Sequence, residues 1–356
     1  MSTKAHADHL VGGTSGHDGV MLTDRRARHE AVSAWLAARD DDELVALLGA
    51  APDAVSVGGG SSVLDVAGAR VFTKRVAITD RELAHPRSTA NLFDLPTYCQ
   101  YGMYPLAGPG FGAWRELAAN EMVTQAVLDG RTEAFALLHH WRVLPGRPRV
   151  ADEHRDVDAV VAQFGGAPGV RMRFEELARA TSSVVLFTEH VGDPLPARLD
   201  GPLGDPATLE RHLFGIVDAL RDLELLHLDA HLGNLRADDE RVYLVDFGLA
   251  TSSAFDLSDD ERAFVVGNRE HDADYVAMRL VNWLVTTVCG VRLPESGGPV
   301  ERNAYVRRCA AGDIPTDVPH DVADILARHA PAAARMNDFC WRLVDGELLT
   351  RYPPTR

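Results

Sequence analysis

The sequence predicts an α+β fold in two lobes, and three observations lead to this prediction. The chain has 356 residues, which is enough for two lobes with a real hydrophobic core. Runs of alternating or β-branched apolar residues, typical of strands, occur at 70–76, 136–144 and 183–188. After residue 208 the apolar residues follow a helical period instead. We therefore expect a small sheet in the first part of the chain and a mostly helical second part.

Two short motifs lie close together at 227–248. The first is His227-Leu-Asp-Ala-His-Leu-Gly-Asn234, and Asp246-Phe-Gly248 begins twelve residues after Asn234. The run 241–245 is β-branched and apolar, so Asp246 follows a buried strand. Phosphoryl transfer from Mg-ATP needs a group that accepts the hydroxyl proton and oxygen ligands for Mg²⁺. Asp229, Asn234 and Asp246 offer these groups in a suitable order.

This segment resembles the catalytic core of the protein-kinase-like superfamily, whose members carry H-R-D-x-x-x-x-N followed by D-F-G. The resemblance implies a bilobal protein-kinase-like fold, with a small antiparallel β-sheet in the N-lobe and a mostly helical C-lobe. It also implies ATP and Mg²⁺ as cofactors. Asp229 would act as the base, Asn234 and Asp246 would bind the metal, and Lys74 would hold the phosphates.

The two motifs resemble different branches of this superfamily. His231 stands where protein kinases usually have Lys, and it resembles the aminoglycoside phosphotransferases and choline kinases. The continuation Asp246-Phe-Gly-Leu-Ala250 resembles protein kinases. His231 would either donate a hydrogen bond near the γ-phosphate or orient the loop, and both roles stay open.

Composition narrows the classes of partner. Hydrophobic residues make up 46% and charged residues 25%, which is ordinary for a globular protein, and no apolar stretch reaches the length of a membrane span. The net charge of −16 disfavours nucleic acid and anionic membranes, which require a basic surface. It would attract a cationic substrate, although solubility alone is the simpler explanation.

The cysteines and the N-terminus indicate a cytoplasmic protein. The four cysteines have no C-x-x-C spacing, as expected for reduced thiols. The first residues lack the apolar core of a signal peptide. Residues 1–50 are expected to form a tail, disordered over 1–20, and a helical extension over 24–49.

A glycine-rich loop and a lysine-bearing strand are expected next. The loop begins at Gly58, where Gly59 and Gly60 would let backbone N–H groups approach phosphate, and Ser61 and Ser62 would add hydroxyl donors. Lys74 follows on the predicted strand 70–76. Lys4 and Lys74 are the two lysines among 36 Lys and Arg residues. A compact ammonium suits contact with two phosphates and a carboxylate, so the position of Lys74 favours a phosphate site.

Helix 114–128 would supply the carboxylate that pairs with Lys74. A helical wheel puts Glu121 on the same face as Trp114 and Leu117, whereas Glu116 lies off that face near the helix start. The wheel favours Glu121, and both residues are kept as candidates.

The lobe boundaries follow from the resemblance. The N-lobe is expected at 51–190 and the helical C-lobe at 191–356. An insert at 77–112 is longer than in protein kinases, and its aromatic residues would form either an acceptor wall or a core of the insert's own. A second, partly helical insert is expected at 152–180. The segment 188–194 would join the lobes, with the backbone at Glu189 and Val191 contacting adenine.

The C-lobe is expected to contain an amphipathic helix at 208–226 and a helix N-terminus at Ser258. A buried helix is expected at 271–284, where Asp272 or Asp274 would brace the catalytic loop, and further helices over 300–352.

The acceptor is left open by the sequence. A small hydroxylated metabolite or antibiotic is favoured by His231, by the absence of an A-P-E triplet and by the acidic charge. A Ser or Thr of a protein or peptide is favoured by Asp246-Phe-Gly-Leu-Ala250. A nucleotide-binding pseudokinase scaffold is the third alternative.

Overall fold

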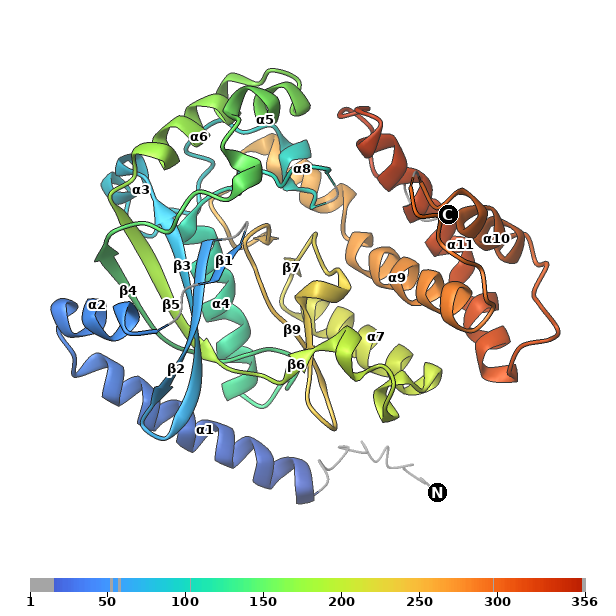
Figure 1. Ribbon diagram of the computed structural model, residues 1–356, viewed down its shortest axis with the longest axis horizontal. Coiled ribbons are helices and arrows are strands. Elements are labelled where there is room, and N and C mark those ends of the chain that lie inside the picture. Colours follow the sequence, from blue (N-terminus) through green and yellow to red (C-terminus); the bar gives the residue numbers. More distant parts are fainter. Residues whose placement is uncertain (1–15, 52–53, 57–58, 103, 297, 354–356) are drawn as a thin grey trace, which may run out of the picture.

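The protein consists of a five-stranded antiparallel sheet with its covering helices and a mainly helical lobe beside it (Figure 1). The computed structural model describes residues 16–51, 54–56, 59–102, 104–296 and 298–353. The expected two-lobed α+β fold, with a small antiparallel sheet and a helical C-terminal part, is confirmed. The strand of this sheet that comes last in the sequence ends at Glu189. The domain boundaries at 50 and 190 stay a prediction.

The sheet has the strand order β1-β2-β3-β5-β4. A tight turn joins β2 to β3 at Ala67 and Gly68, which both have positive φ, as a two-residue hairpin loop requires. The strand bounds are β1 Ala54–Ser56, β2 Gly59–Val66, β3 Ala69–Ile78, β4 Leu138–Pro145 and β5 Ser182–Glu189. These agree with the strands expected around 70–76, 136–144 and 183–188.

The expected glycine-rich loop is a strand over most of its length. Gly59, Gly60, Ser61 and Ser62 belong to β2, and the last three of them pair with β3, where Ser61 lies opposite Lys74. Residues 57–58, at the start of the expected loop, lie outside the described residues. Buried and more exposed residues alternate over 60–66, as expected for a strand. Consecutive glycines by themselves are more typical of a turn or loop.

Helices cover both faces of the sheet. Helix α4 (Ala113–Leu128) packs Trp114 and Leu117 against one face. Helices α1 (Gly16–Ala37) and α2 (Asp41–Gly49) pack their apolar residues against the other face. Helix α1 begins inside the segment 1–20 that was expected to be disordered, and the rest of that segment lies outside the described residues.

Two inserts form one additional layer, which we call the cap and define as residues 79–112 and 146–181. The cap contains α3 (Asp80–Ala84), η1 (Thr97–Gln100), η2 (Asp152–His154), α5 (Val157–Gln163) and α6 (Pro168–Arg179). Phe93 and Phe111 from the first segment pack with Phe164 and Phe174 from the second. The insert aromatics therefore largely build a core of the cap itself, although Tyr104 also lines the cavity described below.

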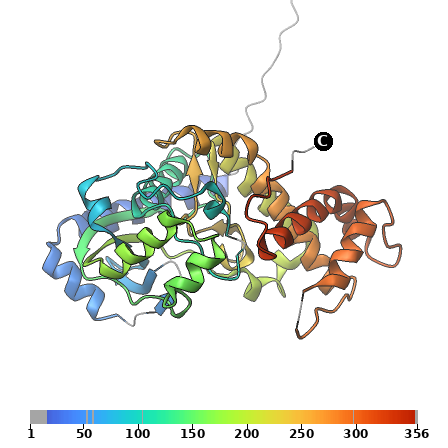
Figure 2. The same ribbon diagram turned by 90° about the horizontal axis from the view of Figure 1, so that it is seen from above.

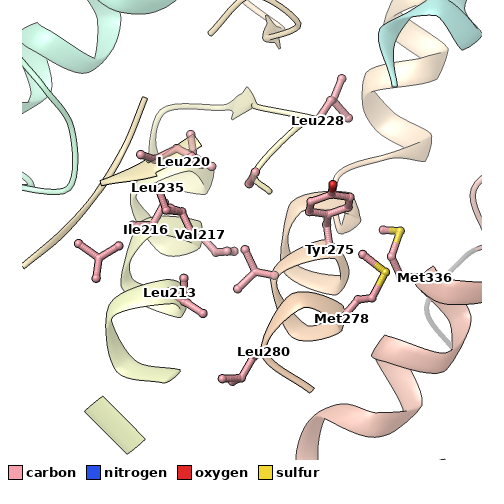
Figure 3. Close-up of a cluster of buried hydrophobic side chains, with 14 of the residues drawn as sticks. Leu213, Ile216, Val217, Leu220, Leu228, Leu235, Tyr275, Met278, Leu280 and Met336 are labelled. Atoms are coloured by element: carbon pink, nitrogen blue, oxygen red, sulfur yellow. The ribbon is translucent and has the colours of Figure 1, made fainter. Parts of the chain in front are cut away.

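The C-terminal lobe is built around a packed pair of helices, α7 (Pro206–Asp222) and α9 (His271–Thr287). Figure 3 shows leucine and valine side chains of α7 directed toward α9, with Met336 of α11 on the far side of α9. The other elements are α8 (Asp259–Gly267), α10 (Val300–Ala310), α11 (His320–Val344), β6 (Asp193–Pro194), β7 (Leu225–Leu226), β8 (Leu235–Ala237), β9 (Val242–Leu244), β10 (Thr251–Ser252), η3 (Leu195–Arg198), η4 (Pro202–Gly204) and η5 (Leu232–Asn234).

Local sequence explains several of these helix ends. Ser258 and Glu261 form a capping box at the start of α8, as the acidic first turn predicted.

The helices α10 and α11 lie at the end of the molecule opposite α1 and α2 (Figure 2). Among the described helices, none is both long and apolar enough to cross a membrane.

Candidate active site

The predicted catalytic loop lies between β7 and β8, and α9 holds its backbone in place. Both oxygens of Asp272, in the first turn of α9, accept backbone hydrogen bonds, from His227 N at 2.6 Å and from Leu228 N at 2.9 Å. Asp274 instead pairs with Arg335 at 2.7 Å. Of the two residues expected to brace the loop, Asp272 is therefore the brace.

Asp229 and Asn234 lie together at the two ends of this loop. Asn234 Nδ2 donates to the backbone oxygen of Asp229 at 3.0 Å and to its Oδ2 at 3.2 Å. Burial, and after it the neighbouring charge of Asp246, raises the pKa of Asp229 to about 8. The Oδ1 of Asp229 has no hydrogen-bond partner within the described part of the chain.

His231 orients the loop in this structure. Its Nδ1 accepts the backbone N–H of Gly233 at 2.9 Å, and its Nε2 lies 3.7 Å from Asp229 Oδ2. Burial lowers the pKa of His231, which favours the neutral ring. Because Nδ1 accepts, a neutral ring carries its proton on Nε2, on the side of Asp229. The hydrogen bond to a phosphate stays a prediction.

Lys74 joins the two lobes at the centre of the site. Its Nζ lies 2.7 Å from Glu116 Oε1 and 2.8 Å from Asp246 Oδ1. Burial alone would lower the pKa of Lys74, but the charges of Asp246 and Glu116 raise it, so the ammonium keeps its proton. One lysine therefore connects β3, α4 and the segment that follows β9.

The preference for Glu121 as the partner of Lys74 is wrong. Glu121 pairs with Arg87 at 2.6 Å near the surface. Helix α4 is buried on two sides, since Trp114 and Leu117 face the sheet while Ala119 and Val123 enter the core of the other lobe. A wheel built on one apolar face therefore could not identify the side on which Glu116 lies.

Asp246 is held in an unusual backbone conformation directly after β9. Its φ is 67°, and its Oδ1 also accepts Gly248 N at 3.2 Å. Burial would raise the pKa of Asp246, but the ammonium of Lys74 and the Gly248 N–H keep it low. Phe247 packs against Phe135 and thereby anchors the segment.

The donor set fits a hard cation that brings further oxygen ligands with it. Asp246 supplies a carboxylate, and the amide oxygen of Asn234 accepts no hydrogen bond from the described residues. No group of three or more His, Cys, Asp or Glu in the described chain could hold a metal by itself. Two protein oxygens completed by phosphate and water are typical of Mg²⁺ bound with a nucleotide.

A cavity of about 570 Å³ lies between the candidate catalytic residues and the cap. One wall consists of the site residues Lys74, Glu116, Asp229, His231, Asn234 and Asp246. The opposite wall comes from both cap segments, including Tyr104, Val150, His154 and Phe174. A volume of this size is typical of small-molecule sites.

Lys74 lines this cavity, but the other described residues expected to contact the nucleotide do not, namely Gly60, Ser61, Ser62, Glu189 and Val191. The carboxylate of Glu189 is bound at 3.1 and 2.6 Å by Arg25 of α1, and Val191 is buried against Tyr243. The roles of Gly59, Gly60, Ser61, Ser62, Glu189 and Val191 stay predictions. Nothing in the sequence singled out Arg25, one arginine of an amphipathic helix.

A further segment of the site was not expected from the sequence. We call residues Cys99–Gly102 the strap, because this part of the cap crosses to the other lobe and lies against Asp229. A Cβ atom at Gly102 would lie 2.2 Å from Asp229 Oδ1. An isolated glycine in a long insert gave no signal of this close approach.

Comparison with known proteins gives limited help. No family model matches the chain, and no curated protein sequence matches it. Among solved structures, the chain is similar to the kinase PK-1 of the Cydia pomonella granulovirus, with 13% identity and a TM-score of 0.40. The match covers 88% of this chain and 97% of the viral kinase. A likeness at this identity and TM-score does not indicate a function.

Proposed function

We propose that this protein is an ATP- and Mg²⁺-dependent phosphotransferase that moves the γ-phosphate of ATP to a hydroxyl group of a small molecule. The observation that carries the proposal is the convergence of Lys74, Asp229, Asn234 and Asp246 on one cavity. These four residues come from both lobes and supply a cation, a base and two metal ligands. Phosphoryl transfer requires this combination and little covalent chemistry from the protein.

Asp229 would position the acceptor hydroxyl and take its proton. The hydroxyl oxygen forms a bond to the γ-phosphorus, and the bond from that phosphorus to the β,γ-bridging oxygen breaks. ADP leaves with the electron pair. A carboxylate with a raised pKa is better suited to receive this proton than an exposed one.

Lys74, Asn234 and Asp246 would hold the nucleotide phosphates. Lys74 is positioned by Glu116, so it can exchange part of its contact with Asp246 for a phosphate oxygen without losing its place. Asn234 and Asp246 would bind Mg²⁺, which neutralises charge on the phosphates. The N–H of His231 Nε2 is available on the same side as Asp229.

A small acceptor is favoured over a polypeptide by the cap. The cap closes one side of the cavity, and the strap lies on Asp229, where an extended peptide would have to pass. The strap also supports one competing function, a nucleotide-binding scaffold without catalysis, because it covers one oxygen of the proposed base. The residues needed for transfer are nevertheless all in place, which favours the enzyme.

The test is ADP release from Mg-ATP by the purified protein. The acceptors are a panel of aminoglycosides, amino-alcohols and Ser/Thr peptides, assayed with the wild type, Asp229→Asn and the control Asp222→Asn at an exposed position. We expect one class of small acceptor to stimulate release in the wild type and the control but not in Asp229→Asn. Protection against heat by ATP, with no stimulated release from any acceptor, would support the scaffold. Absence of ATP protection would overturn both functions.

A further inference from the structure

The strap seals one oxygen of the proposed base. The Cβ that any other residue would place at position 102 lies 2.2 Å from Asp229 Oδ1 and 2.9 Å from Asp229 Cβ, so the backbone of Gly102 packs directly on this side chain. The same Oδ1 is buried and, in the described part of the protein, has no hydrogen-bond partner. An unpaired buried carboxylate oxygen is costly and calls for a functional explanation.

The strap is fastened to the helical lobe by contacts that do not involve the carboxylate. Gln100 Nε2 donates to Leu249 O at 2.6 Å, and the hydroxyl of Tyr101 donates to Asn268 Oδ1 at 2.7 Å. Gly102 N donates to Leu228 O over a longer 3.4 Å. The first two bonds hold the strap together with the buried Tyr101 ring, which packs against Phe264, His271 and Phe339. The contact nearest Asp229 is the longest of the three bonds.

The strap also borders the cavity. Gly102 and Asp229 line it together, and Tyr104, two residues after Gly102, lines the opposite wall. A molecule that fills the cavity therefore meets Gly102 before it reaches Asp229 Oδ1. A single water molecule cannot press on the strap in this way, because it fills only a small part of a cavity of about 570 Å³.

We propose that Gly102 and the strap are specificity-determining: they keep water from Asp229 Oδ1, so that phosphoryl transfer on this oxygen's side of the base waits for an acceptor large enough to fill the cavity and shift the strap. This inference rests on the proposed function and refines its substrate class to compact molecules that reach the cap wall. Without the strap, water would take the place of the acceptor. Its oxygen would bond to the γ-phosphorus, ADP would leave with the electron pair, and the water proton would pass to Asp229, giving ADP and inorganic phosphate.

The test loosens the strap and measures hydrolysis without an acceptor. Tyr101→Phe removes the bond to Asn268, and the double variant with Gln100→Ala also removes the bond to Leu249. One lost hydrogen bond shifts the population of the open strap about fivefold, and two shift it further. We expect release of inorganic phosphate from Mg-ATP to rise by about fivefold in Tyr101→Phe and by more in the double variant, with unchanged nucleotide affinity.

Tyr98→Phe is the matched control. Tyr98 donates its hydroxyl to Phe164 O inside the cap, so its loss removes a similar bond without freeing the strap. Hydrolysis in this control is expected to equal that of the wild type. If all three variants hydrolyse ATP at the wild-type rate, or if Tyr98→Phe rises as much as Tyr101→Phe, the inference is overturned.

A second arm separates this inference from the proposed function. Asp229→Asn is added to the loosened background and is expected to abolish the extra hydrolysis. If the wild type phosphorylates an acceptor while the loosened variants gain no hydrolysis, only the inference fails. If neither the wild type with any acceptor nor the loosened variants release ADP, the proposed function fails and the inference fails with it. Should the double variant not fold, Tyr101→Phe alone decides, because it removes a single oxygen.

Discussion

Among the contacts of the site, the ion pair between Lys74 and Glu116 is the one whose loss should lower both the stability and the transfer rate most clearly. Glu116→Gln keeps the size of the side chain and removes the charge 2.7 Å from Lys74 Nζ. Glu116 is 4% exposed and Lys74 is 8% exposed, so the pair is shielded from solvent. Glu121→Gln is the matched control on the same helix, because its partner Arg87 has a side chain that is 52% exposed.

The structure sets the size of both effects. Removing one partner of a buried ion pair lowers the free energy of unfolding by about 3–5 kcal/mol. We expect a smaller loss of about 1–3 kcal/mol for Glu116→Gln, because Asp246 still neutralises Lys74. An exposed pair such as Arg87–Glu121 contributes about 0–1 kcal/mol. Once Lys74 is no longer fixed by α4, we expect phosphoryl transfer to fall about 100-fold, as a displacement of about 1 Å does in other sites.

The assay is urea unfolding of both variants and the wild type, combined with rates of acceptor phosphorylation. Glu116→Gln is expected to lower the unfolding midpoint and the rate, and Glu121→Gln to change neither appreciably. Equal losses in the two variants would refute the assignment of Glu116. So would a Glu116→Gln enzyme with wild-type stability and rate.

Three further predictions follow from the site and its surroundings. Burial, and after it the nearby His29, lowers the pKa of His139 to about 4, so the unfolded chain binds a proton before the folded one does as the pH falls. The stability that depends on the neutral ring is present above pH of about 6.5 and lost as the pH falls toward 4, by up to about 3 kcal/mol; thermal melts between pH 7 and 4.5 should therefore decline less in His139→Asn than in the wild type. Gly102→Ala should displace the Asp229 carboxylate, so its transfer rate falls at least about tenfold while nucleotide affinity, measured by fluorescence titration, is kept; a wild-type rate would show that the two groups are not in contact. Asp272→Asn should weaken the bonds to the loop backbone and cost about 1–3 kcal/mol in chemical unfolding, and an unchanged unfolding midpoint would remove Asp272 from its bracing role.

The elements with a clear period were predictable from the sequence, and so were the two motifs. β3, β5 and α9 lie within a few residues of the expected positions, because each has one continuous apolar pattern. Asp229, Asn234 and Asp246 converge as their spacing predicted, because a loop and a short hairpin separate them. Local sequence was sufficient wherever the partners are close in the chain.

Contacts between distant segments were not predictable in this way. The cap joins two inserts separated by α4 and β4, so neither segment reveals the shared core by itself. The choice between Glu116 and Glu121 failed because α4 packs against both lobes. The contact of Gly102 with Asp229 joins residues far apart in the chain. A single glycine outside any glycine-rich motif does not indicate such a contact.

The most direct test of the central claim is acceptor-stimulated ADP release by the wild type and by Asp229→Asn in the presence of Mg-ATP. If the protein is a phosphotransferase, a small hydroxylated acceptor will raise ADP release in the wild type, the phosphate will appear on that acceptor, and Asp229→Asn will lose the stimulation while still binding ATP. An Asp229→Asn protein that transfers phosphate at the wild-type rate would contradict the account, because Asp229 could then not be the base.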